Sequence, residues 1–124
     1  MRYGLILFAH GARDPAWAEP FEALAERVRA LVPQTEVRLA FLELMQPDLE
    51  TAAGELIARG VECIRVVPLF FGQGGHVRRD LPERIGQLRQ RHPRITFETA
   101  PPAGEDRTVL DALARYCAQG LDRS

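Results

Sequence analysis

The sequence predicts an α/β fold in which a four-stranded parallel sheet has helices on both faces, forming a three-layer sandwich. Four short apolar runs alternate with four segments of helical periodicity along 124 residues. Two of these runs, the first and the third, show little polar alternation, as expected for central strands covered on both sides. The length suits one domain, residues 1–124, that buries about two-thirds of its unfolded surface.

The predicted strands are Gly4–Ala9, Glu36–Leu42, Cys63–Phe70 and Ile95–Thr99. The first predicted helix carries an apolar stripe at 3.6-residue spacing from Phe21 to Val32. The second has Pro47 in its first turn, a position that suits proline, and ends at Gly60.

The third predicted helix begins at Asp80, because an acidic capping residue is followed three positions later by Glu83. Pro93 ends this helix, and the fourth helix runs from about Asp106 to Gly120. Strict alternation of strand and helix implies parallel strands joined by right-handed crossovers.

Composition excludes several classes of partner. The net charge is −1 and no basic patch is evident, so nucleic acid is not an expected partner. No apolar run is long enough to cross a membrane, and the N-terminal run lacks the pattern of a signal peptide. We therefore expect a cytoplasmic protein in which Cys63 and Cys117 are reduced core thiols.

Missing residue types exclude several catalytic mechanisms. The chain has no lysine, so it has neither a Schiff-base lysine nor a P-loop lysine. Its only serine is the terminal Ser124, and it has no asparagine, which rules out the serine elbow and the Cys-His-Asn triad. Histidine, carboxylate, arginine and backbone amides remain available for catalysis.

Three polar residues follow three predicted strands: His10 the first, Glu43 the second and His76 the third. Because the carboxyl ends of parallel strands share one edge of a sheet, these side chains are expected to converge on one crevice. Two imidazoles and a carboxylate suit a divalent first-row metal with open coordination positions. The same groups could also transfer protons near neutral pH.

Each of these residues also has a structural interpretation. His10 could be a hydrogen-bonded loop residue, and Glu43 could be paired with an arginine. Gly74 and Gly75 let the backbone approach a ligand closely, but a tight turn is the commoner reason for such glycines. Three arginines flank the predicted crevice and could bind carboxylates with forked geometry, or be solvated loop charges: Arg13, Arg78 and Arg79. Four aromatic residues could form an apolar wall for a flat ligand, or pack in the core: Trp17, Phe41, Phe70 and Phe71.

The strand ends carry a combined pattern. Its segments are Leu7-Phe8-Ala9-His10-Gly11, Phe41-Leu42-Glu43-Leu44 with Gln46-Pro47, and Val67-Pro68-Leu69-Phe70-Phe71 with Gly75-His76 and Asp80. With this pattern the chain resembles the class II chelatases, in particular the short-form sirohydrochlorin cobaltochelatases, over roughly residues 4 to 100. The resemblance implies a chelatase-like variant of the flavodoxin-like three-layer sandwich.

The resemblance also implies an activity: ATP-independent insertion of a divalent metal into the tetrapyrrole sirohydrochlorin. Co²⁺ is the first expectation, and Fe²⁺ and Ni²⁺ also suit the ligands. The metal is a substrate, and no tightly bound cofactor is expected. Long forms of the family hold two such domains in tandem, so this half-length chain is expected to form a homodimer.

By the same resemblance, His10 and His76 handle the metal and Glu43 is the nearby acid. The substrate-binding residues are then Arg13, Phe71, Gly74, Gly75, Arg78 and Arg79. Ala12 stands where the family commonly has serine, which removes a hydroxyl contact.

Two alternatives stay open from sequence. A metal or tetrapyrrole carrier on the same scaffold would keep the same histidines. A histidine phosphatase would explain the His10-Gly11-Ala12-Arg13 segment, but Ala9 then stands where that signature has arginine.

Overall fold

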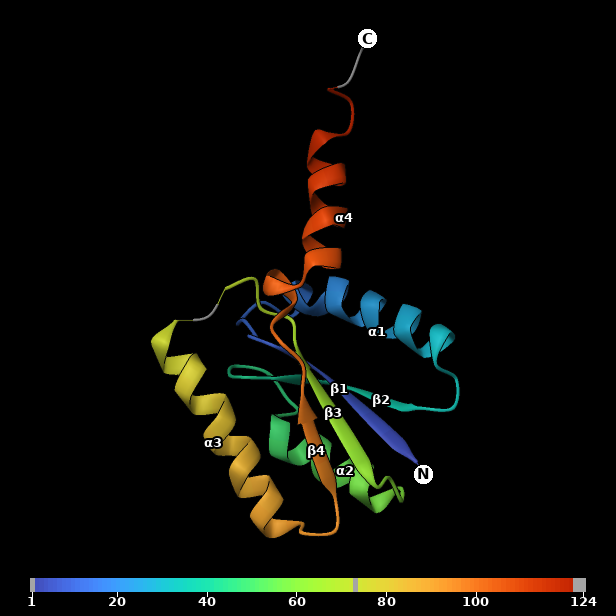
Figure 1. The fold of residues 1–124 in the computed structure, drawn as a ribbon, viewed down its shortest axis with the longest axis vertical. Helices are drawn as coiled ribbons and strands as arrows, with labels where there is room; N and C mark the ends of the chain where they lie inside the picture. The colour runs from blue at the N-terminus through green and yellow to red at the C-terminus, as the bar shows by residue number, and fades with distance from the viewer. Residues whose placement is uncertain (1, 73, 122–124) are drawn as a thin grey trace.

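The computed structural model describes residues 2–72 and 74–121 and confirms the predicted α/β sandwich. One sheet contains β1 (Tyr3–Ala9), β2 (Glu36–Phe41), β3 (Cys63–Pro68) and β4 (Thr96–Thr99). The spatial order is β2-β1-β3-β4, and every neighbouring pair is parallel (Figure 1). The carboxyl ends of the strands therefore lie along one edge of the sheet.

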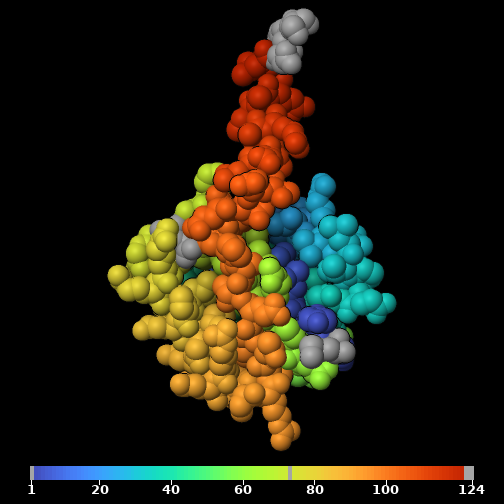
Figure 2. Space-filling view, in the orientation of Figure 1, coloured from blue at the N-terminus to red at the C-terminus, as the bar shows by residue number. Residues whose placement is uncertain are grey.

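The helices are α1 (Glu19–Leu31), α2 (Leu49–Ala58), α3 (Gly75–Arg91) and α4 (Arg107–Ala118), with short 3-10 helices η1 (Pro15–Ala18) and η2 (Ala103–Glu105). On one face of the sheet, α2 and α3 pack against the side chains of Ile6, Phe8 and Phe97. On the other face, α1 packs against Leu7 and Val37. In contrast, α4 points away from the body of the domain (Figures 1 and 2).

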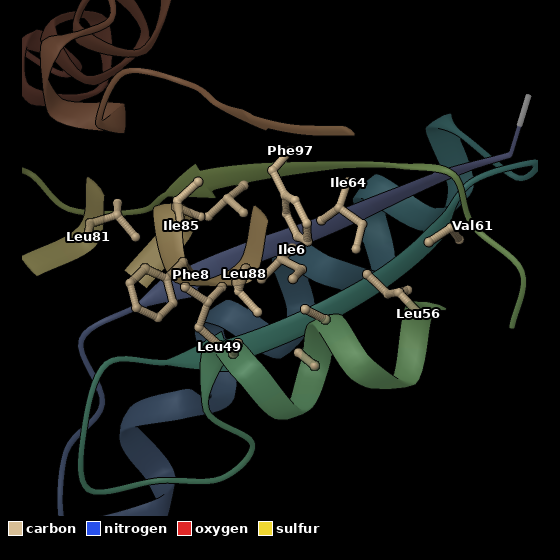
Figure 3. Packing of buried hydrophobic residues seen from close by; sticks show 14 of the residues in the cluster. Ile6, Phe8, Leu49, Leu56, Val61, Ile64, Leu81, Ile85, Leu88 and Phe97 are labelled. Carbon is tan, nitrogen blue, oxygen red and sulfur yellow. The ribbon is translucent and has the colours of Figure 1, made fainter. Parts of the chain in front are cut away.

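The main core lies between the sheet and the α2–α3 layer (Figure 3). Alternate residues of β1 point into it, which is why Ile6 and Phe8 are fully buried while Leu5 faces the α1 side. Leu49 and Leu56 of α2 pack against them from one face of that helix. Each such side chain contributes about 1.5–3 kcal/mol relative to an exposed one.

The predicted start of the third helix was wrong. The structure begins α3 at Gly75, and Pro82 lies inside the helix rather than in its first turn. The segment before Asp80 can be helical because Val77 packs against the core one turn ahead of Leu81. Asp80 is not a cap but an ion-pair partner of Arg84 at 3.6 Å, one turn further on.

The second helix also begins later than predicted. Pro47 precedes the capping residue Asp48, whose carboxylate accepts a hydrogen bond from the Thr51 N–H at 2.8 Å. A hydrogen bond with the Thr51 side chain is the main reason that the pKa of Asp48 is lowered, and the bond from the Thr51 N–H lowers it further. An aspartate that caps a helix accepts a hydrogen bond from a free N–H of the first turn. A proline side chain has no acceptor and cannot do this.

The prediction of two core thiols was half right. Both cysteines are free, and Cys63 is buried, but Cys117 is exposed. Its helix, α4, buries none of its residues, so an apolar position on it does not become a core position. In the described part of the chain no helix is long and apolar enough to cross a membrane.

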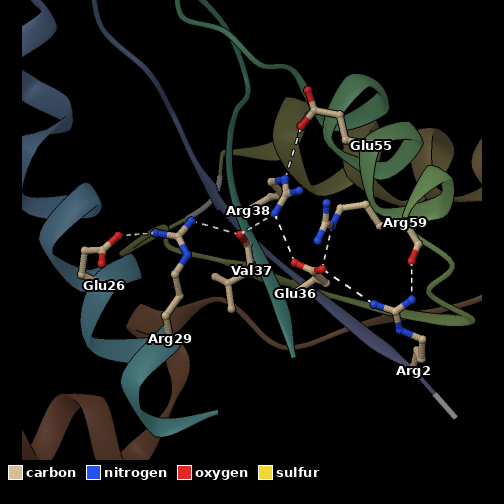
Figure 4. Close-up of polar contacts among 8 residues, drawn as sticks. All are labelled: Arg2, Glu26, Arg29, Glu36, Val37, Arg38, Glu55 and Arg59. Carbon is tan, nitrogen blue, oxygen red and sulfur yellow. Dashed lines mark hydrogen bonds and ion pairs between the residues drawn. The ribbon is translucent and has the colours of Figure 1, made fainter. Parts of the chain in front are cut away.

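Charged side chains gather near the start of β2 and the end of α2 (Figure 4). Glu36 contacts Arg59 at 2.6 Å and both Arg2 and Arg38 at 3.8 Å. The hydrogen bond from Arg59 is the main reason that the pKa of Glu36 is lowered. Because β2 starts at the amino edge of the sheet, this network is at the opposite end from the predicted crevice.

Candidate functional site

The loops after β1 and β2 are joined directly at the carboxyl edge of the sheet. The Leu42 N–H donates to the Ala9 carbonyl at 2.8 Å, and the Glu43 N–H donates to the His10 carbonyl at 3.0 Å. These bonds continue the β1–β2 ladder beyond the strands. The backbones of His10 and Glu43 are therefore adjacent.

Gly11 makes this close approach possible. Its φ is +92°, in the left-handed region, and a Cβ at this position would overlap the Glu43 carbonyl oxygen. Both the dihedral and the contact exclude larger residues. Gly11 thus holds the Glu43 loop against the His10 loop.

Replacing Gly11 by alanine is expected to lower the free energy of unfolding by about 1–3 kcal/mol, because the side chain strains the backbone and pushes the Glu43 loop away. Gly54→Ala is the matched control, since a methyl group at this position inside α2 would meet nothing within 4 Å. That control is expected to gain up to about 1 kcal/mol of stability. Urea unfolding of both variants measures the difference; equal effects would show that Gly11 is not required.

The His10 imidazole is exposed and lies on an aromatic support. Its ring centroid is 4.3 Å from that of Phe70, with 37° between the planes. Phe70 is 1% exposed and contacts Phe8 at 5.7 Å between centroids. The imidazole makes no hydrogen bond within residues 2–72 and 74–121. The structure thus disfavours the hydrogen-bonded loop interpretation of His10 and leaves its nitrogens available.

A partly buried ion pair lies beneath this aromatic support. The Arg84 guanidinium lies 5.6 Å from the centroid of the Phe8 ring and donates two hydrogen bonds to Glu50, at 2.9 and 2.7 Å. Only 18% of the Arg84 side chain is exposed. Contacts therefore run from Glu50 through Arg84, Phe8 and Phe70 to His10. Sequence reasoning missed this support because Glu50 and Arg84 are far apart in the chain.

The Glu50–Arg84 pair predicts a pH dependence of stability. The hydrogen bonds from Arg84 hold the pKa of Glu50 below its ordinary value of 4.5. A lowered folded-state pKa gives stability that is present above the unfolded-state value and is lost as pH falls through the folded one. Glu50→Gln is expected to cost about 1–3 kcal/mol at pH 7 and to flatten the loss of stability below about pH 4.5.

Urea unfolding at several pH values tests this expectation. Glu26→Gln is the control, because its partner Arg29 forms an exposed pair in which Glu26 is 74% exposed. Exposed pairs contribute about 0–1 kcal/mol. If the free energy of unfolding of wild type and of Glu50→Gln varied with pH in the same way, the pH dependence could not come from the Glu50–Arg84 pair.

His76 lies in the first turn of α3 and is exposed. The glycines before it include Gly72 and Gly74, and at neither position would a Cβ meet an atom within 4 Å. Neither has a positive φ, so no left-handed turn requires glycine at these two positions. A side chain at Gly72 or Gly74 would therefore meet open space, on the same edge as His10.

Glu43 is exposed and makes no ion pair with the residues that the structure describes. The structural alternative of an arginine partner for Glu43 is therefore not observed. Within the described ranges, no three His, Cys, Asp or Glu side chains form a group that could hold a metal ion. The assignment of His10, Glu43 and His76 to metal and proton handling stays a prediction.

The three predicted substrate arginines are exposed residues around this edge. Arg13 follows the His10 loop, and Arg78 and Arg79 lie in the first turns of α3. The Arg78 guanidinium is 3.9 Å from Glu105 in η2, an exposed pair that a stronger anion could displace. The Arg79 guanidinium lies over Gly75, 3.8 Å from where a Cβ would stand.

The aromatic residues divide between core and surface. Phe41 is 5% exposed and contacts Trp17 at 6.5 Å between ring centroids, so the core interpretation holds for Phe41. Phe71 is 68% exposed and directly follows Phe70, the residue against which the His10 ring lies. A hollow of about 450 Å³ lies beside Phe41, lined also by Pro15 and Met45 from the two joined loops. Phe71 is therefore the predicted wall residue that is available to a ligand at this edge.

The CbiX family model matches residues 4–119. Among curated proteins, the sirohydrochlorin cobaltochelatase of Sulfolobus acidocaldarius is 33% identical over 118 residues, which cover 95% of this chain and 92% of the relative. The sirohydrochlorin ferrochelatase of Bacillus subtilis is 28% identical, and the match covers 91% of this chain but 43% of the relative.

Solved structures show the same likeness. A CbiX protein of cobalamin biosynthesis from Marinobacter aquaeolei has a TM-score of 0.84 and 35% identity, covering 98% of this chain and 99% of its own. The sirohydrochlorin chelatase SirB from Bacillus subtilis subspecies spizizenii, in complex with cobalt, has a TM-score of 0.82 and 28% identity; 97% of this chain matches 51% of SirB.

Proposed function

The chain belongs to the CbiX family, and we propose that it catalyses insertion of a divalent metal ion into sirohydrochlorin without ATP. The observation that carries the proposal is the exposed His10 imidazole at the end of β1, held on Phe70 beside the Glu43 backbone. It stands within a sequence matched almost end to end by a sirohydrochlorin cobaltochelatase.

The metal is a substrate in this proposal, and no resident cofactor takes part. Cobalt is the first choice because the cobaltochelatases match over nearly their whole length. A ferrochelatase is also among the relatives, so Fe²⁺ is a competing metal, and Ni²⁺ suits the same donors. Imidazole and carboxylate do not by themselves select among these ions.

In the mechanism we propose, His10 and His76 hold the incoming ion loosely, with positions open to the macrocycle. Four macrocycle nitrogens replace the protein ligands as metal–nitrogen bonds form. Two pyrrole N–H protons leave in the same process, so the charge of the M²⁺ is balanced by two H⁺ released. His10 or Glu43 accepts these protons before they pass to water, since both side chains are exposed. Weak holding is required, because a closed tight site would retain the ion.

Substrate docking follows from the residues around the edge. Sirohydrochlorin is a flat macrocycle with carboxylate side chains. Arg13, Arg78 and Arg79 would pair with those carboxylates, and the exposed Phe71 ring would contact the macrocycle face. Open space at Gly74 and the small Gly75 would let the macrocycle approach the backbone.

We also propose that the protein is a cytoplasmic homodimer. The match to the two SirB structures covers 97% and 100% of this chain but only 51% and 49% of the SirB chains. Two copies of the chain would supply the length that one SirB chain contains.

The decisive experiment counts turnovers. Purified protein is mixed with a large excess of sirohydrochlorin and Co²⁺, and the visible spectrum of the metallated product is followed against a protein-free control. Many product molecules per protein would support an enzyme. A burst of one product or less per protein would contradict it and favour the carrier, which keeps the same histidines.

A further inference from the structure

The chain contains the same structural unit twice. β1, α1 and β2 form one strand-helix-strand unit, and β3, α3 and β4 form the other, with β1 and β3 side by side in the sheet. In the first unit, Arg29 of α1 donates to the Val37 carbonyl of β2 at 3.0 Å. In the second, Arg89 of α3 donates to the Phe97 carbonyl of β4 at 2.8 Å. The two units can therefore be compared position by position.

Each unit has a hollow between its helix and its outer strand. The first hollow, of about 450 Å³, lies beside α1, β2 and the loop after β2. The second, of about 420 Å³, lies between α3 and the carboxyl end of β4 (Figure 1). Corresponding helix positions line the two hollows: Glu22, Ala25 and Arg29 in the first, and Pro82, Ile85 and Arg89 in the second.

The arginine of the second hollow lacks the partner that its counterpart has. In α1, Glu26 accepts a hydrogen bond from Arg29 at 2.6 Å. In α3 the corresponding position is Gly86, where an added Cβ would meet no atom within 4 Å. Arg89 makes no ion pair with the residues that the structure describes. A guanidinium has five N–H donors, so one bond to a carbonyl leaves most of them for a ligand.

The second hollow is positively charged and otherwise almost wholly apolar. Arg78 also lines it, about 16 Å from Arg89 along the axis of α3. The Arg78 guanidinium is 3.9 Å from Glu105, in an exposed pair, and no carboxylate is among the described residues that line the hollow. Apart from Thr99, the rest of the lining is apolar: Pro68, Leu81, Pro82, Ile85, Ala100 and Pro102.

We propose that this second hollow binds a small aliphatic dianion, with a carboxylate at each end of an apolar body. Each carboxylate pairs with one guanidinium, whose forked donors match carboxylate geometry. The body covers apolar surface between them, including the edges of Leu81 and Ile85. No aromatic ring is among the described lining residues, so nothing there stacks on a base or a flat macrocycle. His10 and Phe71 do not line this hollow, and the inference does not depend on metal insertion.

Calorimetric titration with suberate, an aliphatic diacid, tests the proposal. Wild type is expected to bind one suberate per chain. Octanoate, which has the same chain length but one carboxylate, is expected to bind about tenfold or more weakly, because one arginine is then left without a partner.

Two variants remove the charge of Arg89 in different ways. Gly86→Glu gives Arg89 the partner that Glu26 provides for Arg29, at the same spacing in the helix. Arg89→Gln removes the guanidinium. Both are expected to weaken suberate binding about tenfold or more. Gly86→Glu also replaces a glycine inside a helix, so it is expected to unfold at the same or a higher urea concentration than wild type.

Gln87→Glu is the matched control. It adds the same charge to the same turn of α3, but residues two positions apart do not face each other on a helix, so Arg89 keeps its charge. Suberate affinity is expected to stay within about twofold of wild type, since the added charge is exposed and screened by salt.

The carboxylate arms of a tetrapyrrole are the other source of the same chemistry. Sirohydrochlorin binding, followed by fluorescence without metal, is therefore measured for wild type and Arg89→Gln and is expected to be equal. Weaker sirohydrochlorin binding in Arg89→Gln would place the arms of the macrocycle in the hollow and overturn a separate ligand.

The other outcomes are equally distinct. Loss of suberate binding in Gly86→Glu and Arg89→Gln, with Gln87→Glu unchanged, supports the site. No heat of binding in wild type overturns it. Equal weakening in Gln87→Glu also overturns it, because net charge alone would then explain the effect. Equal affinity for octanoate would contradict a ligand that spans both arginines.

Discussion

Replacing His10 by alanine is expected to lower the rate of Co²⁺ insertion into sirohydrochlorin about 100-fold or more, the usual loss when a proton-transfer group is removed. The imidazole is exposed and makes no hydrogen bond with the described residues, so the free energy of unfolding is expected to change little. Initial rates from the visible spectrum and urea unfolding of the same preparation provide the two measurements.

His92→Ala is the matched control for this variant. His92 is the capping residue at the carboxyl end of α3, whereas the predicted site adjoins the amino end of that helix. It is expected to keep the wild-type rate. Full activity in His10→Ala would remove this histidine from the mechanism. Loss of stability in His10→Ala would instead reveal a structural role.

Replacing Phe70 by alanine is expected to cost about 3–5 kcal/mol of unfolding free energy, because a fully buried ring would leave a cavity. The ring contacts Phe8 on one side and the His10 imidazole on another, so its loss also frees the imidazole to move. We therefore expect metal insertion to fall even at temperatures where the variant is folded. Urea unfolding and rate measurements at low temperature separate the two effects.

Phe71→Ala is the control for stability, since this neighbouring ring is 68% exposed. Its unfolding free energy is expected to stay within about 0.5 kcal/mol of wild type. Its KM for sirohydrochlorin should rise, because the ring is placed to contact the macrocycle. Equal stability losses at both positions would contradict the division into buried support and exposed wall.

The fold was predictable because its signals are local. Central strands such as Gly4–Ala9 are continuous apolar runs, and helices show their period within a few turns. The errors came where tertiary contacts outweigh local signals. The acidic residue Asp80 resembled a helix cap, but Val77 packs in the core and Asp80 pairs with Arg84. Cys117 has apolar neighbours in sequence, yet nothing in the described part of its own chain buries them.

The candidate site was predictable only in part. Position after a strand assigns His10, Glu43 and His76 to one edge, because strand direction determines that edge, but the three side chains do not form a group that could hold a metal ion within the described ranges. Their support was not predictable. The contact from Glu50 to Arg84 depends on how α2 and α3 pack side by side, which no spacing in the sequence expresses.

The strand order has a consequence for how such a site can change. From β1 the chain turns to β2 on one side, and from there it crosses to β3 on the other. The loops after β1 and β3 therefore lead to helices on opposite faces, α1 and α3, which is the arrangement at which open α/β sheets generally bind their ligands. The order in which the strands are connected separates α1 from α3, and no individual side chain is needed to hold the two helices apart. Residues of these loops, such as Ala12, can be exchanged during evolution to favour another metal or macrocycle while the sheet beneath stays the same.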